Sequence, residues 1–125
     1  MARLMSVALT EPQVRARSKT VTRRMGWHVL KPGDRLTLCR KVMGRHRGEP
    51  LVRIVDVRVL TVRRERLDEI TPDEVLAEGF PEMSPPEFVE FFCGSHKGCT
   101  PDSEVTRIEW SYLDPEPEVE QFTLL

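Results

Sequence analysis

Residues 51–62 give the strongest structural signal in this 125-residue chain. Most of their apolar side chains are β-branched, which favours an extended strand over a helix. The alternation of apolar and polar residues slips once, near Ile54. A slip of this kind is typical of a β-bulge or of a strand that bends around a barrel. We therefore expect a sheet organised around one long, bent strand.

Shorter elements surround this strand. Further strands are expected at residues 6–10, 20–24, 35–42 and 105–113, with a turn at 31–34 and a basic hairpin loop at 44–50. A short helix is expected at 11–17. Two more helices should begin after Thr71 and Ser84, each followed by proline, with the first ending at Gly79. Together these elements predict an α+β fold: a small mixed β-barrel with two or three short helices.

Charge is distributed unevenly along the chain. Residues 1–66 contain 17 Lys and Arg against 5 Asp and Glu, whereas residues 67–125 contain 2 against 15. The basic half could attract phosphate groups. Alternatively, its charges simply face water on the strands, or the acidic half folds across it. The domain is expected to span residues 1–113, followed by an acidic, proline-containing tail at 114–125.

Composition indicates a soluble globular protein, with 39% hydrophobic and 31% charged residues. No apolar run has the length of a membrane span, so no membrane partner is expected. The N-terminus lacks the apolar core of a signal peptide. Three cysteines are an odd number, which argues against a disulfide framework and favours a reducing cytoplasm.

Residues 18–24 concentrate chemical functionality. Within seven positions they carry the amine of Lys19, the hydroxyls of Thr20 and Thr22, and the guanidinium groups of Arg23 and Arg24. These groups suffice to bind an anion, and also to activate a nucleophile. Both interpretations therefore stay open at this point.

The order of motifs resembles the ASCH domain, a compact β-barrel related to the PUA fold. The resemblance rests on residues 19–24, 31–34, 70–80 and 105–110, and it extends over about residues 6–113. It implies binding of RNA or of a modified nucleoside in a cleft of the barrel, without a cofactor. One small bacterial branch hydrolyses the acetyl amide of N4-acetylcytidine with a lysine, a threonine and a glutamate. Lys19, Thr22 and Glu78 match those positions.

These three residues also suit amide hydrolysis on chemical grounds. Thr22 could supply the nucleophile, Lys19 the base, and Glu78 could orient the lysine or pass a proton to the leaving amine. Residues three apart on a strand point to opposite faces, so Lys19 and Thr22 meet only if the chain bends at 18–20. Without that bend, Thr20 is the second candidate hydroxyl. Alternatively, Lys19, Arg23 and Arg24 contact phosphate, and Glu78 is an exposed carboxylate at a helix end.

Other candidates lie outside this motif. Trp27 and His28 could stack on a nucleobase, although Trp27 could equally cap the barrel core. Arg45 and Arg47 in the hairpin loop could reach a nucleic-acid backbone or could simply be solvated. Three potential metal donors are spaced by three positions, but a flexible loop with incidental donors is the preferred interpretation and no metal is predicted; these donors are Cys93, His96 and Cys99.

Overall fold

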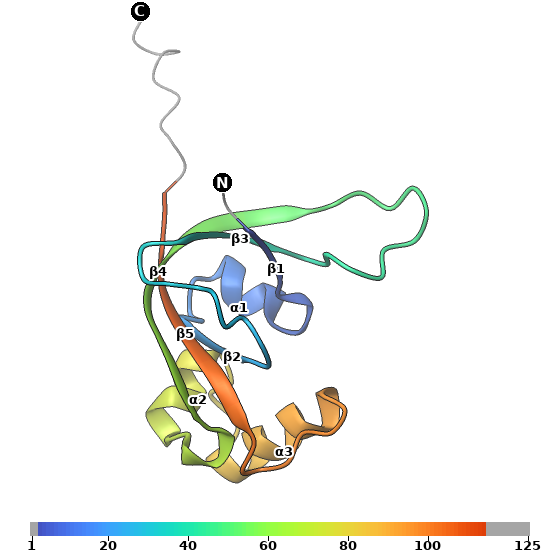
Figure 1. The fold of residues 1–125 in the computed structure, drawn as a ribbon. Coiled ribbons are helices and arrows are strands. Elements are labelled where there is room, and N and C mark those ends of the chain that lie inside the picture. Colours follow the sequence, from blue (N-terminus) through green and yellow to red (C-terminus); the bar gives the residue numbers. More distant parts are fainter. Residues whose placement is uncertain (1–2, 115–125) are drawn as a thin grey trace, which may run out of the picture.

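The computed structural model describes residues 3–114 and contains a single five-stranded sheet with the order β1-β3-β4-β5-β2. β1 and β3 are parallel and all other neighbours are antiparallel. The sheet curls, and its edge strands β1 and β2 are not paired with each other, which leaves an open half-barrel (Figure 1). This confirms the predicted α+β fold with a mixed, barrel-like sheet. The strand bounds are β1 Arg3–Ser6, β2 Val21–Arg24, β3 Arg35–Cys39, β4 Arg53–Arg66 and β5 Glu104–Tyr112.

Two bulges bend the long strand β4. Leu38 pairs with Val55 and Cys39 with Arg53, so that Ile54 is the extra residue opposite β3. A second register shift lies between Val59 and Thr61 on the side of β5. Extra residues of this kind increase local twist and bend a strand. The slip near Ile54 in the sequence therefore corresponds to a bulge, as predicted.

Three α-helices and two 3-10 helices complete the fold. α1 is Glu11–Arg15, α2 is Pro72–Glu78, α3 is Pro85–Ser95, η1 is Ala8–Thr10 and η2 is Leu67–Glu69. The Thr71 hydroxyl accepts a hydrogen bond from the Glu74 amide at the start of α2, and Ser84 forms a capping box with Glu87 at the start of α3. α2 ends at Gly79, whose φ of +103° lies in the left-handed region. These starts and stops agree with the sequence patterns.

The strand predicted at residues 6–10 is wrong. β1 ends at Ser6, and the chain then turns through η1, where the Thr10 amide donates to the Val7 carbonyl. Val7 and Thr10 are buried while Leu9 is 65% exposed. A short apolar run fits a buried turn as well as a strand, and the periodicity does not separate the two. The strand predicted to reach residue 42 likewise ends earlier, at Cys39.

The buried side chains form two clusters. In the first, Val14 of α1 packs inside the curve of the sheet, against residues such as Leu38, Val57 and Trp110. The second joins α2 and α3 to η2 and to the start of β5, and includes Leu67, Phe88 and Val105. β5 therefore contributes to both clusters, and η2 follows directly on β4, so that the two longest strands connect the sheet to the helices (Figure 1).

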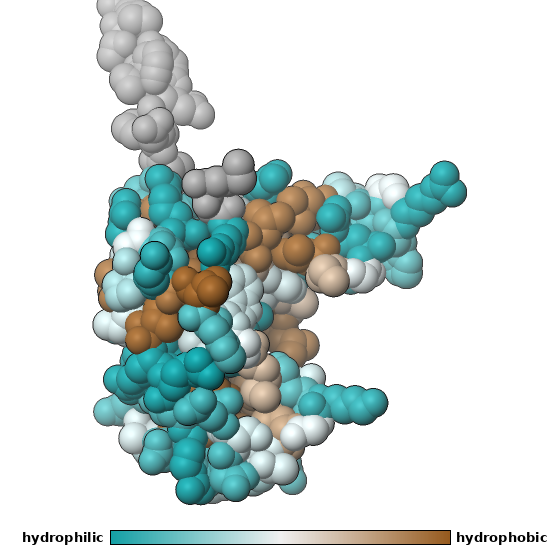
Figure 2. All heavy atoms as spheres, viewed as in Figure 1, coloured by the Kyte–Doolittle hydropathy of each residue, from teal (hydrophilic) through white to brown (hydrophobic). Residues whose placement is uncertain are grey.

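The loop between β3 and β4 projects from the body as a long arm (Figure 1). Most of its surface is hydrophilic (Figure 2). No helix in the described part of the chain has the length and hydrophobicity to cross a membrane. The predicted acidic tail, apart from Asp114, lies outside the described residues.

Candidate functional site

A cavity of about 230 Å³ lies between η1, β2, the end of α2, and α3. Figure 2 shows a hollow between the projecting arm and the helical end of the molecule, with apolar residues along its floor. The cavity has one apolar wall and one charged wall. The apolar wall includes Val7, Ala8, Leu9, Phe80, Phe88, Phe91 and Phe92, and the polar lining includes Lys19, Thr22, Arg23, Arg24, Glu78, Ser95 and His96.

Lys19 and Glu78 form a buried ion pair in the charged wall. The two side chains are 2% and 4% exposed, and Lys19 Nζ lies 2.9 Å from Glu78 Oε1. The same ammonium donates to the Glu78 carbonyl oxygen, also at 2.9 Å. Glu78 is therefore not an exposed carboxylate at a helix end, and that alternative is wrong. Burial keeps a charged pair of this kind together, because separating it would leave an unpaired charge in a low-dielectric site.

The chain bends before β2, as the proximity of Lys19 and Thr22 requires. Arg17 has a φ of +60°, and β2 begins only at Val21, so that Lys19 precedes the regular strand. The Lys19 carbonyl accepts hydrogen bonds from Trp110 Nε1 and from the Tyr112 hydroxyl. These contacts hold Lys19 outside the strand alternation, and its side chain lines the same cavity as Thr22.

Thr22 and Arg24 share one face of β2, as residues two apart should. Arg24 Nε donates to Thr22 Oγ1 at 3.2 Å, and Arg24 Nη2 donates to the Ser6 carbonyl at 2.8 Å. Arg24 thus bridges the two edge strands of the sheet. Within residues 3–114, no hydrogen bond joins Lys19 Nζ to Thr22 Oγ1.

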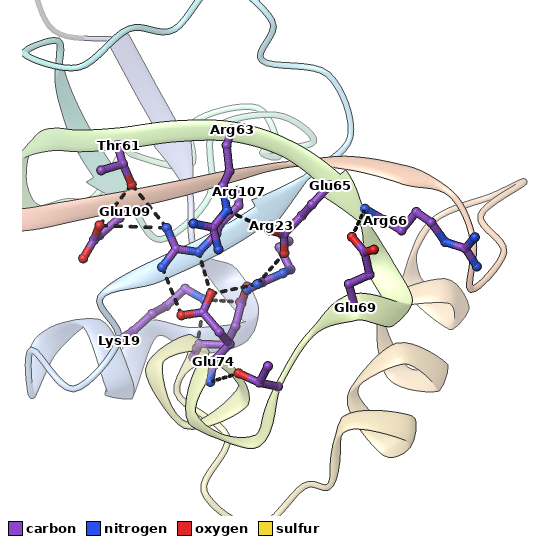
Figure 3. A network of polar contacts seen from close by, with 12 residues as sticks. Lys19, Arg23, Thr61, Arg63, Glu65, Arg66, Glu69, Glu74, Arg107 and Glu109 are labelled. Carbon is purple, nitrogen blue, oxygen red and sulfur yellow. Dashed lines mark hydrogen bonds and ion pairs between the residues drawn. The ribbon is translucent and has the colours of Figure 1, made fainter.

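Arg23 points into a network of carboxylates rather than toward solvent (Figure 3). Its side chain is fully buried and pairs with Glu65 and Glu74 at 2.8 Å and with Glu78 at 3.1 Å. Arg107 binds the same Glu74 through two nitrogens. Glu74 and Glu78 belong to the acidic half and Arg23 to the basic half, so at this site the two halves pair as one of the sequence alternatives proposed. Arg23 is occupied by these contacts and is poorly suited to grip an external phosphate.

The environment changes how readily the site groups ionise. Burial lowers the pKa of Lys19, and Arg24 and Arg23 add to this effect, while Glu78 opposes it. The Arg107 guanidinium holds the pKa of Glu74 at about 2, with Arg23 contributing. A lysine with a lowered pKa has a larger neutral fraction, which is the form that can accept a proton.

The remaining predicted site residues lie elsewhere. Thr20 does not line the cavity; its amide donates to the Ala77 carbonyl and its carbonyl accepts from the Trp110 amide. Trp27 packs against the first core cluster, consistent with the core alternative, and His28 is exposed. Arg45 and Arg47 are exposed on the projecting arm.

The sequence analysis did not identify most of the apolar wall of the cavity. Phe88, Phe91 and Phe92 of α3 have the spacing of an apolar helix face, but this spacing gives no sign that part of the face lines a cavity. His96 follows α3; its ring stacks on Phe92 with centroids 4.1 Å apart, and its Nδ1 lies 2.9 Å from the Phe92 carbonyl oxygen.

The sulfur atoms of Cys93 and Cys99 lie 3.2 Å apart. No group of three metal-donating side chains is assembled among residues 3–114.

Comparison with known proteins shows the fold. No protein-family model matches the sequence, and no curated protein is significantly similar to it. Among solved structures, the hypothetical protein PH0355 is similar with a TM-score of 0.65 and 18% identity, over 90% of this chain and 100% of that protein. Protein EF3133 from Enterococcus faecalis V583, of family DUF984, has a TM-score of 0.64 and 12% identity, over 91% and 81%.

An ASCH domain from Lactobacillus crispatus JV V101 has a TM-score of 0.61 and 11% identity, over 88% of this chain and 79% of that one. At sequence identities of 11–18%, the similarity shows that the folds are alike. The resemblance noted in the motifs is thus confirmed at that level: the chain has the fold of an ASCH domain.

Proposed function

We propose that the cavity binds a single acylated pyrimidine nucleoside and hydrolyses the amide on its base. The observation that carries this proposal is the convergence of Lys19, Thr22 and Glu78 on one small cavity with an apolar wall. Ligand pockets typically measure roughly 300–1,000 Å³. The cavity, at about 230 Å³, lies below this range, which limits the ligand to a small molecule about as large as one nucleoside.

In the proposed reaction, Thr22 Oγ1 attacks the amide carbonyl and the neutral amine form of Lys19 accepts the hydroxyl proton, which converts it to the ammonium. Lys19 then gives this proton to the leaving amino group of the base, and water releases the acyl group from Thr22. The lowered pKa of Lys19 supports the base role. Glu78 orients the ammonium, and Arg24 Nε fixes the position of the Thr22 oxygen.

The test is release of cytidine and acetate from N4-acetylcytidine by the purified protein. Lys19→Ala and Thr22→Ala should abolish turnover, whereas Thr22→Ser should retain part of it because the hydroxyl remains. Ser111→Ala, on β5 outside the cavity, is the matched control and should turn over normally. Circular dichroism verifies that each variant is folded. Normal turnover by folded Thr22→Ala excludes Thr22 as the nucleophile.

A second candidate function is RNA binding through the projecting arm. Arg45 and Arg47 are exposed there, and neither forms an ion pair in the part of the chain that the structure describes. Affinity for single-stranded RNA should then fall with salt, and replacing both arginines by glutamine should flatten the slope of log K against log [salt] by about one to two units. Arg66→Gln, at the helical end, should change this slope less. A salt-independent affinity contradicts RNA binding through these residues.

A further inference from the structure

The cavity contains a half-buried cation, Arg24, that no carboxylate within residues 3–114 contacts. Lys19 pairs with Glu78, and Arg23 pairs with Glu65, Glu74 and Glu78. Arg24 lines the same cavity, yet within residues 3–114 it forms no ion pair. In the part of the chain that the structure describes, its guanidinium donates hydrogen bonds only to the neutral oxygens of Thr22 and Ser6.

An anion bound in the cavity would supply the counter-charge that Arg24 lacks within the described residues. A guanidinium cannot lose its proton under ordinary conditions, so Arg24 remains charged. Removing a charge from water without a counter-charge costs free energy. Burial accordingly lowers the pKa of Arg24. Nε and Nη2 already have acceptors, whereas Nη1 has none within residues 3–114.

The other cations of the charged wall do not compete for this role. Arg23 has three carboxylate partners, and Lys19 is held by two oxygens of Glu78. A guanidinium presents planar donors that match carboxylate and phosphate groups. The lining of the cavity also includes four phenylalanines, which suit a flat ring.

We propose that Arg24 forms an anion subsite, and that the natural ligand combines a pyrimidine-like ring with a phosphate or carboxylate group. This inference rests on the proposed function, because it names the class of nucleoside derivative that the same cavity accepts. It favours a nucleotide or a carboxylated pyrimidine over a neutral nucleoside.

The test is calorimetric binding in a phosphate-free buffer with three probes: cytidine, cytidine 5′-monophosphate and orotate. The wild-type protein should bind at least one anionic probe about tenfold or more tightly than cytidine, since charge-assisted hydrogen bonds are stronger than neutral ones. Preference for the monophosphate identifies a phosphate ligand, and preference for orotate identifies a carboxylate. Equal affinities for all three, or no binding of either anionic probe, overturn the subsite.

Two variants assign the preference to Arg24. Arg24→Gln should remove the preference for the anion and retain cytidine binding, and Arg24→Lys should keep part of the preference. Arg53→Gln, exposed on β4 outside the cavity, is the matched control. A preference that survives in folded Arg24→Gln overturns the assignment. If both Arg24 variants fail to fold, a competition experiment with the wild-type protein decides. Inorganic phosphate should then displace the anionic probe, and a failure to displace it counts against the subsite.

These outcomes are separable from those of the proposed hydrolysis. Turnover of N4-acetylcytidine without any preference for anions removes the subsite and leaves the hydrolase. Tight binding of an anionic probe without turnover removes the hydrolase and leaves the subsite.

Discussion

Replacing Glu74 by glutamine should destabilise the protein in a pH-dependent way. Glu74 is the carboxylate that Arg23 and Arg107 share, and its side chain is 22% exposed (Figure 3). Its pKa is lowered from 4.5 to about 2, with Arg107 as the largest cause. At about 1.4 kcal/mol for each pKa unit, the ionised carboxylate stabilises the folded state by about 3 kcal/mol at pH 7.

The sign of the pH dependence follows from the lowered pKa. The stabilisation is fully present above pH 4.5 and is lost as pH falls toward the folded-state pKa of about 2. The difference in unfolding free energy between wild type and Glu74→Gln should therefore shrink from about 3 kcal/mol at pH 7 to about 1 kcal/mol at pH 3.

Urea denaturation followed by tryptophan fluorescence at pH 7, 5 and 3 measures this difference. Glu104→Gln is the matched control, because Glu104 pairs with Arg64 at 3.1 Å but its side chain is 63% exposed. Exposed pairs typically contribute less than about 1 kcal/mol, so this variant should differ little from wild type. A Glu74→Gln difference that stays constant from pH 7 to pH 3 refutes the electrostatic explanation and indicates a packing defect.

Two further substitutions test the packing around the site. Gly79→Ala should lower the free energy of unfolding by about 1–3 kcal/mol, because φ is +103° and an added Cβ would lie 2.9 Å from Gln13 Cγ. Urea denaturation measures this loss. A loss below about 0.5 kcal/mol, which is typical of a surface substitution, contradicts the prediction. Leu38→Ala, at a fully buried position of the first cluster, should cost about 2–5 kcal/mol and lower the thermal midpoint. An unchanged midpoint means that Leu38 is not part of a closely packed core.

The fold was predictable where local chemistry determines it. Thr71 and Ser84 initiate helices through their own side chains, and Gly79 ends one because it tolerates a positive φ. The bulge at Ile54 was visible because a slipped register changes which residues are apolar. β1 was misplaced, since an apolar run of five residues does not distinguish a strand from a buried turn. Only packing against the rest of the chain decides between them.

The site was predictable only in part, for a related reason. Lys19, Thr22 and Glu78 were singled out by residue type and by resemblance, and the structure places them around one cavity. The partners of Arg23 were not foreseen, because Glu65 and Glu74 lie 42 and 51 positions away. Contacts at such separation leave no periodic trace in a sequence. For the same reason, Arg23 and Arg24 were equal candidates for anion contacts in the sequence analysis.

The two walls of the cavity differ in how freely their residues can be substituted during the evolution of proteins with this fold. Loss of Glu78, for example, would leave buried Lys19 without the carboxylate that it pairs with in the described residues, so substitutions at this ion pair would have to occur in compensated pairs. Phe91, Ser95 and His96 line the cavity from α3 and its end but are not fully buried. Single substitutions at these three positions would reshape the cavity without disturbing a buried ion pair. New ligand preferences can therefore evolve one step at a time along α3 while the charged wall persists.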